Sequence, residues 1–190
     1  MEHQVKRILA SLVVALGIVL GLGATPAQAA SAPGWNNWLM PTGTICVQTG
    51  TQTWLPLATA AWHWNKSDAT MIYRVSCTGY ARSMTVITRS YSSSSDGACA
   101  KFTGGGWSWQ KVRGVWTWVP KAPTILVNQW SRIRAHCQGT YRRRLNLMSH
   151  ELGHVLGLSH ATGITVMRTY NNETYVVPTV YDIARVNRRY

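Results

Sequence analysis

The sequence has few acidic residues and almost no phenylalanine. Six Asp and Glu residues stand against 19 Lys and Arg, which gives a formal net charge of +13, and ten tryptophans accompany a single phenylalanine. This cationic excess favours anionic partners, but no motif typical of nucleic-acid-binding proteins supports that class. No internal repeat is evident. The 190 residues suffice for one domain with one core, and are too few for two.

Long apolar runs are absent except near the N-terminus. There, Lys6 and Arg7 precede an apolar stretch over residues 8–22, and Ala27 and Ala29 form an A-x-A cleavage pattern. The stretch is short for a hydrocarbon core of ~30 Å, which favours a secretory signal peptide over a membrane anchor. We therefore expect a signal peptide at residues 1–29, a single domain over residues 30–190, and a secreted, extracellular protein with no membrane span after signal removal.

A C-x-x-C pair is also absent, which argues against a zinc site built from thiolates. An even number of cysteines in an oxidising compartment predicts two disulfides, and sequence alone leaves all three pairings open. The four candidates are Cys46, Cys77, Cys99 and Cys137.

Apolar periodicity predicts an α+β protein. Alternation of apolar and polar residues indicates strands, and spacing of three and four residues indicates helices. The expected helices cover residues 55–66, with Leu55, Ala58, Trp62 and Asn65 on one face, residues 141–157, and residues 178–190. The expected strands cover residues 44–49, 71–76, 84–88 and 124–128, and a Ser-rich loop is expected over residues 92–97.

Four tryptophans cluster in the segment WSWQKVRGVWTWVP, residues 107–120. Trp107 and Trp109 would share one face of a strand, as would Trp116 and Trp118, and the residues between can turn the chain. We therefore predict a β-hairpin. The four indoles could form an exposed platform for sugar rings or peptides, or a cross-strand cluster within the core, and both interpretations stay open.

The segment HELGHVLGLSH, residues 150–160, carries the clearest chemical signal. Residues four apart lie above one another on a helix, so His150 and His154 would present their rings to one point. Two imidazoles at this spacing suit a tetrahedral zinc ion, and Glu151 lies close enough to reach a water molecule there. The opposite face of this helix is apolar, so it would pack against the core.

Gly157 allows a third histidine to join the first two. A continued helix would carry His160 to the wrong face, whereas a glycine with positive φ ends the helix and turns the chain back. Three protein ligands leave one position open, as in a catalytic zinc site. Five fixed positions of this kind arise by chance in roughly one chain in 10⁵ of this composition.

This segment resembles the H-E-x-x-H-x-x-G-x-x-H signature of the metzincin metalloproteases, and every fixed position matches. Met167, seven residues after His160, resembles the Met-turn of that family at the short spacing of the matrixin branch. The resemblance implies a small secreted member of bacterial type with a metzincin-like (zincin) fold. That fold has a twisted mixed β-sheet, three main helices including the active-site helix 141–157, and a short C-terminal subdomain.

Weaker similarities extend the resemblance beyond the signature. Residues 55–66 resemble the first helix of a matrixin domain, and residues 177–190, with Asp182 and Ile183, resemble its closing helix. TILVN resembles the edge strand that pairs with extended substrates; its residues are Thr124, Ile125, Leu126, Val127 and Asn128.

The sequence also departs from the family. The six acidic residues include Glu2, so only five follow residue 29, and no family-type calcium site is expected. No room exists for a propeptide with a cysteine switch between Ala29 and Cys46. Tyr170 stands three residues after Met167 rather than two, which leaves its role undefined.

The resemblance implies a zinc-dependent endopeptidase. His150, His154 and His160 would hold one Zn²⁺, which lowers the pKa of its water to roughly 7, and Glu151 would act as general base and pass the proton to the leaving amine. A peptide or protein substrate would pair with the strand at residues 124–128. We expect a monomer.

Two alternatives remain. One is a proteolytically silent, zinc-containing cationic protein that binds anionic cell-envelope surfaces, although the intact Glu151 argues against a pure binder. The other is an envelope-binding or antimicrobial module whose activity survives zinc removal.

Three consecutive arginines begin the helix at residues 141–157: Arg142, Arg143 and Arg144. Their charges oppose the helix dipole there, so they do not serve helix stability. They either attract anionic wall polymers and acidic substrates or form a solvated patch.

Overall fold

The computed structural model describes residues 40, 43–49, 52–90, 99–112, 114–169 and 173–190. All of them belong to one compact unit, Pro33–Tyr190. The predicted signal peptide, the Ser-rich loop and Tyr170 lie outside the described residues. Within the described ranges, every helix is too short or too polar to serve as a membrane span.

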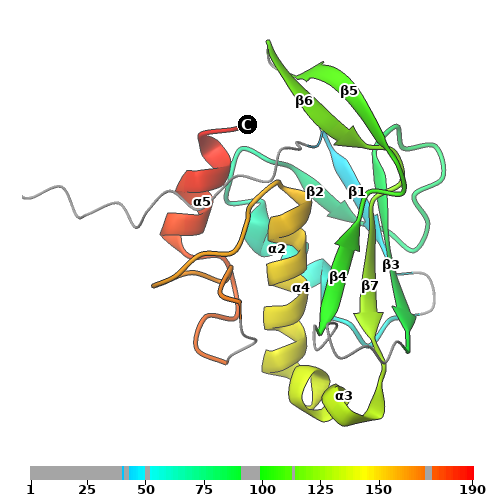
Figure 1. The fold of residues 1–190 in the computed structure, drawn as a ribbon, viewed down its shortest axis with the longest axis vertical. Helices are drawn as coiled ribbons and strands as arrows, with labels where there is room; N and C mark the ends of the chain where they lie inside the picture. The colour runs from blue at the N-terminus through cyan, green and yellow to red at the C-terminus, as the bar shows by residue number, and fades with distance from the viewer. Residues whose placement is uncertain (1–39, 41–42, 50–51, 91–98, 113, 170–172) are drawn as a thin grey trace, which may run out of the picture. The chain divides into compact units, whose positions relative to one another are not determined.

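A mixed five-stranded sheet forms the framework, in the order β2-β1-β3-β7-β4 (Figure 1). Strands β1 (Ile45–Gln48), β2 (Met71–Tyr73), β3 (Ser83–Arg89) and β7 (Thr124–Asn128) are parallel, and β4 (Ala100–Thr103) is antiparallel to β7. The predicted α+β class and mixed sheet are confirmed. The predicted strands agree with β1, β2, β3 and β7, whereas β4 was not predicted.

The prediction that residues 124–128 form an edge strand is wrong. Strand β7 pairs with β3 on one side, where Ile125 faces Val86, and with β4 on the other, where Ile125 faces Phe102. Its backbone groups are therefore used in two ladders. Among the described residues, β2 and β4 are the outermost strands of this sheet. The chain forms the edge strand β4 first and then returns to form β7 between β4 and β3. Apolar periodicity does not show this order of strands in the sheet.

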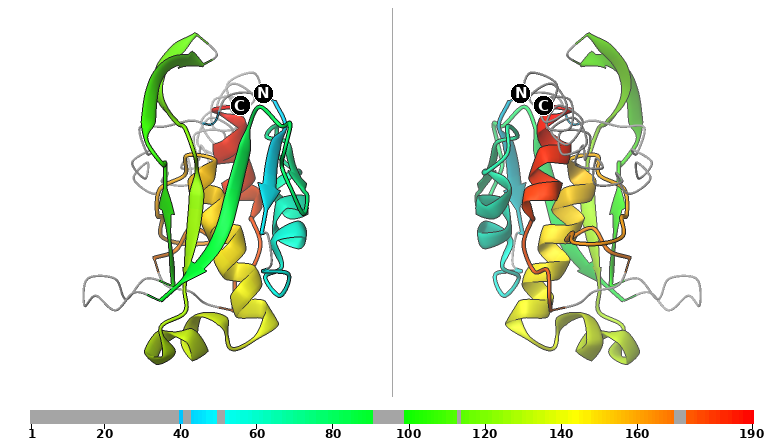
Figure 2. Two further views of the ribbon diagram at one scale, coloured as in Figure 1. Left: turned by 90° about the vertical axis from the view of Figure 1, so that its right-hand side faces the viewer. Right: turned by 90° about the vertical axis from the view of Figure 1, so that its left-hand side faces the viewer.

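Helices α2 (Leu57–Trp64) and α4 (Tyr141–Val155) pack against each other and cover one face of the sheet, as the two views of Figure 2 show. Helix α3 (Ser131–Gln138) precedes α4, and α5 (Val180–Asn187) lies near the C-terminus. Three main helices were expected and α3 was not among them. The segment SRIRAHCQ is largely polar, so it lacks the apolar stripe that identifies a helix in a sequence.

The helix face that the spacing picked out in residues 55–66 is not the face that packs against the core. The residues that face the core are Leu57, Ala60, Ala61 and Trp64, whereas Trp62 is exposed. Pro56 occupies the N-cap position, so the helix begins later than expected and its apolar stripe is displaced by two residues. Trp64 is completely buried, and its Nε1 donates a hydrogen bond to the Ser149 carbonyl of α4 at 2.9 Å.

Helix α4 forms as its sequence predicts. The Thr140 hydroxyl accepts a hydrogen bond from the Arg143 amide at 3.1 Å and so caps the first turn. The apolar side of this helix is buried, as expected, and consists of Leu145, Met148, Leu152, Val155 and Leu156. The opposite side of the same helix is therefore held in a fixed direction relative to the sheet.

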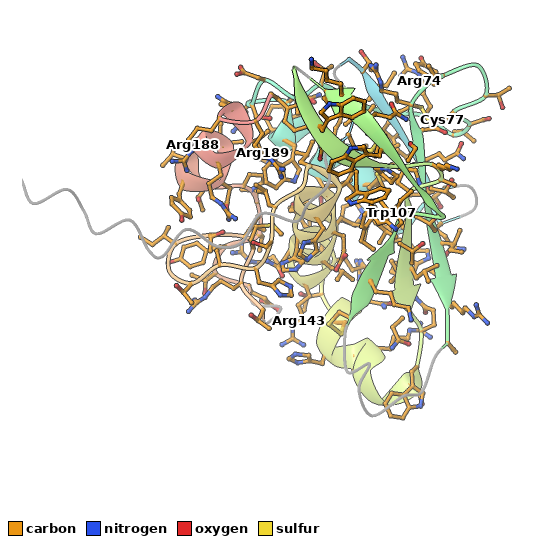
Figure 3. All side chains as sticks on the ribbon, turned by 45° about the horizontal axis from the view of Figure 1, so that its top comes forward. Arg74, Cys77, Trp107, Arg143, Arg188 and Arg189 are labelled. Carbon is orange, nitrogen blue, oxygen red and sulfur yellow. A yellow bond between two sulfur atoms is a disulfide. The ribbon has the colours of Figure 1, made fainter. Side chains whose placement is uncertain are left out.

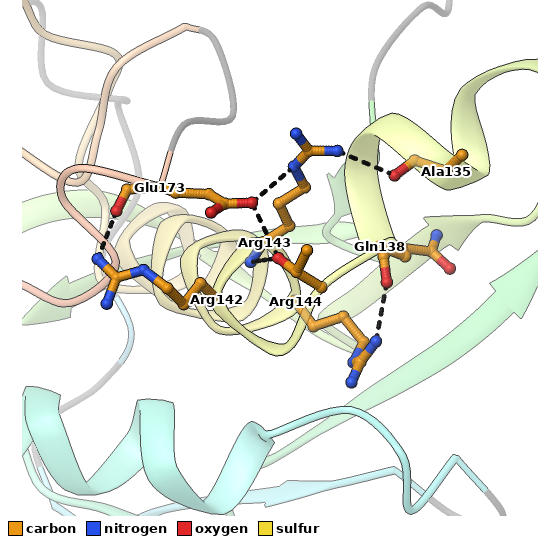
Figure 4. A network of polar contacts seen from close by, with 7 residues as sticks. Ala135, Gln138, Arg142, Arg143, Arg144 and Glu173 are labelled. Carbon is orange, nitrogen blue, oxygen red and sulfur yellow. Dashed lines mark hydrogen bonds and ion pairs between the residues drawn. The ribbon is translucent and has the colours of Figure 1, made fainter.

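The three arginines at the start of α4 make internal contacts (Figure 4). Arg142 donates to the Glu173 carbonyl at 2.6 Å, Arg143 pairs with the Glu173 carboxylate at 2.9 Å, and Arg144 donates to the Gln138 carbonyl at 2.9 Å. These contacts join α4 to α3 and to the segment before α5. The cluster thus has a structural role that neither interpretation of the sequence included.

Strands β5 (Trp107–Val112) and β6 (Val115–Pro120) form the predicted hairpin, a separate two-stranded sheet (Figure 1). Val112, Thr117 and Val119 are buried, whereas all four tryptophans are exposed. Trp109 contacts Trp118 and Trp116 across the strands, with ring centroids 5.0 and 6.3 Å apart. The indoles therefore form a cross-strand cluster that is exposed rather than part of the core.

Two disulfides are present, as predicted, and the structure selects one of the three possible pairings. Cys46 in β1 joins Cys77, which follows β2 and is labelled in Figure 3, and Cys99 before β4 joins Cys137 in α3. The first bond fixes the loop between β2 and β3 to the sheet. The second fixes α3 to the start of the edge strand.

Candidate metal centre

Three imidazole rings converge at the C-terminal half of α4. The candidate ligand atoms of His150, His154 and His160 all lie within 4.8 Å of one another. The His160 Nε2 lies 3.2 Å from the Nε2 of His150 and 3.3 Å from the Nε2 of His154. These side chains could together hold a metal ion, as the sequence predicted.

The outer nitrogens of two rings are fixed by backbone carbonyls. His150 Nδ1 lies 3.0 Å from the Val166 oxygen, and His154 Nδ1 lies 2.7 Å from the Leu158 oxygen. A carbonyl oxygen only accepts hydrogen bonds, so each Nδ1 carries the proton and each Nε2 presents its lone pair to the centre. Metal-binding histidines are commonly oriented in this way. The donor set therefore fits a transition-metal ion.

Burial keeps these rings neutral. It lowers the pKa of His150 to about 3 and that of His154 to about 4, and it also lowers the pKa of His160. A second cause for His150 is repulsion from His154. Only a neutral imidazole has a lone pair to donate, so the environment favours the form that binds a cation at neutral pH.

The end of α4 brings the third histidine to the other two. The Gly157 amide donates to the His154 carbonyl at 2.8 Å, and the Leu158 amide donates to the Gly153 carbonyl at 2.9 Å. Gly157 has φ of +80°, which confirms the predicted reversal. These two bonds form a Schellman motif. The chain therefore leaves the helix sharply, and His160 returns to the face that carries His150 and His154.

Glu151 is a buried acid next to the first histidine. Its side chain is 4 % exposed, and its Oε2 has no hydrogen-bond partner among the described residues. Burial raises the pKa of its carboxyl to about 8. An isolated buried carboxyl group is unfavourable for folding, and a cation or a polar ligand beside it would offset that cost. This isolated oxygen is a second observation that fits a metal centre.

Met167 packs against the helix that carries the centre. Met167 is completely buried, and a Cβ added to Gly153 would lie 2.2 Å from its Sδ and 3.0 Å from the Trp64 ring. Only glycine at position 153 leaves space for this approach. Sequence reasoning singled out Met167 but missed Gly153, although a glycine inside a helix is a signal of close packing.

Asp182 of α5 supports the segment that orients His150, a role that sequence reasoning missed. Its carboxylate accepts hydrogen bonds from the Thr165 hydroxyl, from the Val166 amide at 3.0 Å and from Thr179. The Val166 carbonyl is the acceptor for His150. The capping box of Thr179 and Asp182 is readable in the sequence, but the bonds to residues 165 and 166 are not.

Other predicted residues do not join the centre. The four cysteines form disulfides elsewhere, and residues 124–128 lie inside the sheet. Strand β4 packs along α4 instead, so the outer strand accompanies the helix that carries the histidines. A scan against models of protein families finds no match to this chain, and a search of curated proteins finds no significant match.

Proposed function

We propose that this protein is a zinc-dependent endopeptidase of the metzincin type, similar to the matrixin branch. The observation that carries the proposal is the convergence of the Nε2 atoms of three neutral imidazoles, two of them on the helix that also carries the buried Glu151. Four further features support it. They are the spacing of the histidines, the helix-ending Gly157, the glutamate next to His150 in the sequence, and the burial of Met167.

We infer zinc as the metal because the number and kind of ligands match those of a catalytic zinc site. Imidazole nitrogens are common zinc ligands, and three protein ligands leave a position for water or substrate. When bound, Zn²⁺ would supply Lewis acidity, which polarises a carbonyl group and lowers the pKa of a water molecule to roughly 7. His150, His154 and His160 would hold the ion, and the Val166 and Leu158 carbonyls would keep two of the rings oriented.

Glu151 would move the proton. Burial raises the pKa of its carboxyl to about 8, whereas a nearby cation would lower it again. A carboxyl group with a pKa near neutrality can accept a proton at Oε2 and later release it to a leaving amine. The absence of a hydrogen-bond partner for Oε2 among the described residues supports this role, because the atom is not committed to a structural bond.

An extended peptide would add to the sheet at β4 rather than at residues 124–128. Strand β4 is the outer strand on the side of the sheet that packs along α4. Addition of a strand to an edge provides main-chain hydrogen bonds regardless of side chains. The predicted signal peptide and the two disulfides favour an extracellular place of action.

The test is cleavage of a diverse peptide library by residues 30–190, which contain the whole compact unit, with zinc content measured in parallel. We expect the wild type to cleave, and Glu151→Ala and Glu151→Gln to bind zinc normally while their activity falls by roughly 10²- to 10⁴-fold. Glu173→Gln is the matched control, because Glu173 pairs with Arg143 and should leave the activity unchanged.

Two outcomes would contradict the proposal. A Glu151 variant that cleaves at the wild-type rate would show that another group moves the proton. A wild type that holds one zinc ion per chain and cleaves no peptide in the library would show a metal centre with a different use.

A further inference from the structure

We propose that the exposed side of the β5–β6 hairpin docks this protein on the surface of an anionic lipid bilayer. We call this side the Trp face, which consists of Trp107, Trp109, Lys111, Trp116 and Trp118. The proposal is independent of the metal centre, since it uses no residue of that site.

The register of the hairpin places these side chains together. Trp109 faces Trp118 and Lys111 faces Trp116 across the two strands, so all four lie on the same side. The other side carries the buried Val112 and Val119, which belong to the main core. The Trp face is therefore the exposed side of the hairpin.

The base of the hairpin is held to the sheet. A Cβ added to Gly104 would lie 2.5 Å from the Trp107 ring, and the Phe102 ring of β4 lies edge-on to it with centroids 6.3 Å apart. Figure 3 shows Trp107 at this junction. The Trp face thus begins next to the outer strand and continues along the two-stranded hairpin.

The exposure of four neighbouring indoles is unusual for a protein surface. Trp107, Trp109, Trp116 and Trp118 are 40, 53, 57 and 43 % exposed. A cluster of large exposed apolar groups marks an interaction site. Indole rings combine an apolar body with one N–H donor, and tryptophan is enriched at the boundary between lipid headgroups and acyl chains for this reason.

Ring geometry favours a bilayer over a sugar polymer. Trp109 is inclined by 63° to Trp118 but lies within 6° of parallel to Trp116. The rings therefore do not share one plane, whereas stacking on a flat polysaccharide requires coplanar faces. Tryptophan is enriched at membrane–water interfaces, so exposed indoles that are not coplanar suit partial insertion there better than stacking on a flat sugar polymer.

The charge of the surrounding surface favours anionic lipids. Lys111 lies within the Trp face, and the segment from Trp107 to Pro120 contains no acidic residue. Of the four acidic residues described, Glu151 and Asp182 are buried and Glu173 pairs with Arg143. The described surface therefore carries almost no negative charge to repel an anionic headgroup, and its cations attract one.

The test is co-sedimentation of residues 30–190 with vesicles of phosphatidylglycerol and phosphatidylcholine, compared with vesicles of phosphatidylcholine alone. We expect partition onto the anionic vesicles to be stronger by roughly tenfold and to weaken with salt. Trp109→Ser with Trp116→Ser should lower it by roughly tenfold or more. Trp62→Ser is the matched control, because Trp62 is 62 % exposed on α2 and lies outside the Trp face.

A second variant tests the proposal even if the double tryptophan variant fails to fold its hairpin. Lys111→Glu keeps all four indoles and should weaken binding to the anionic vesicles only. The proposal is overturned if the wild type does not sediment with vesicles, or if the double tryptophan variant and Lys111→Glu both bind like Trp62→Ser. Sedimentation with an insoluble polysaccharide but not with vesicles would also overturn it, in favour of sugar recognition.

Discussion

Gly153 lies inside a helix although glycine is unfavourable there, because close packing leaves no space for a larger side chain. Glycine inside a helix normally costs about 0.5–1 kcal/mol relative to alanine. Here the space that a methyl group would need is taken by the Met167 Sδ and the Trp64 ring. The helix that carries His150 and His154 is thus held against the core at a distance that only glycine permits.

We predict that Gly153→Ala destabilises the protein, by about 1–3 kcal/mol, because the added methyl group overpacks a completely buried region. Denaturant unfolding would measure this change. In a double-mutant cycle with Met167→Ala, the two changes together should cost less than their sum, since the smaller side chain makes room for the methyl group. A stabilised Gly153→Ala protein would show that helical preference outweighs the contact.

Much of the candidate centre was predictable at the residue scale, because its ligands follow from local geometry. The four-residue spacing of a helix places His150 beside His154, and a positive φ at Gly157 returns the chain to them. The contacts of Met167 with Gly153 and of Asp182 with Val166 were not predictable. They join separate segments, and their partners depend on how those segments pack.

The first turn of helix α5 contacts the segment that orients His150. Thr179 and Asp182 form a capping box, and the same Asp182 carboxylate holds Thr165 and Val166. One side chain thus stabilises the start of the helix and also fixes the loop whose carbonyl orients His150.

We predict different effects for the two members of this capping box. Thr179→Ala should cost about 1 kcal/mol, with little change in zinc affinity, since it removes a helix cap. Asp182→Asn should lower zinc affinity by roughly tenfold, because it disturbs the support of a metal ligand. Competition with a chelator would measure both affinities. Equal affinities for the two variants would show that the bond from Val166 to Asp182 has no influence on the centre.

Elements with strong periodicity were predicted well, and weakly patterned ones were missed. Residues 124–128 form β7 with the expected bounds, but their position inside the sheet depends on pairing with strands distant in the sequence. Strand β4, AKFT, has a single large apolar side chain and α3 is mostly polar, so neither has a pattern apolar enough to identify. The Cys99–Cys137 bond holds these two missed elements together.

At the scale of the whole molecule, each of the two disulfides stabilises a different part of the compact unit. One closes a sequence separation of 31 residues within the parallel strands, and the other closes 38 residues between the outer strand and α3. In the chain-entropy account, closures of such similar length restrict the unfolded chain to a similar extent.

We predict that Cys46→Ser with Cys77→Ser, and Cys99→Ser with Cys137→Ser, each lower the free energy of unfolding by about 2–4 kcal/mol. Denaturant unfolding of the two double variants beside the wild type would measure the loss. The two losses should agree closely, because the loop lengths are similar. A loss below about 1 kcal/mol for either pair would mean that its bond adds little to the packing around it.

The residues of the candidate metal centre lie late in the chain, after all the strands of the sheet. All the sheet strands lie before residue 129, whereas the ligands and their supporting Asp182 lie between residues 150 and 182. A chain made or exported from its N-terminus presents the sheet first and the centre last. The support of α5 is therefore missing until nearly the whole chain has emerged, so the three candidate ligands would be the last part of the molecule to reach their final arrangement.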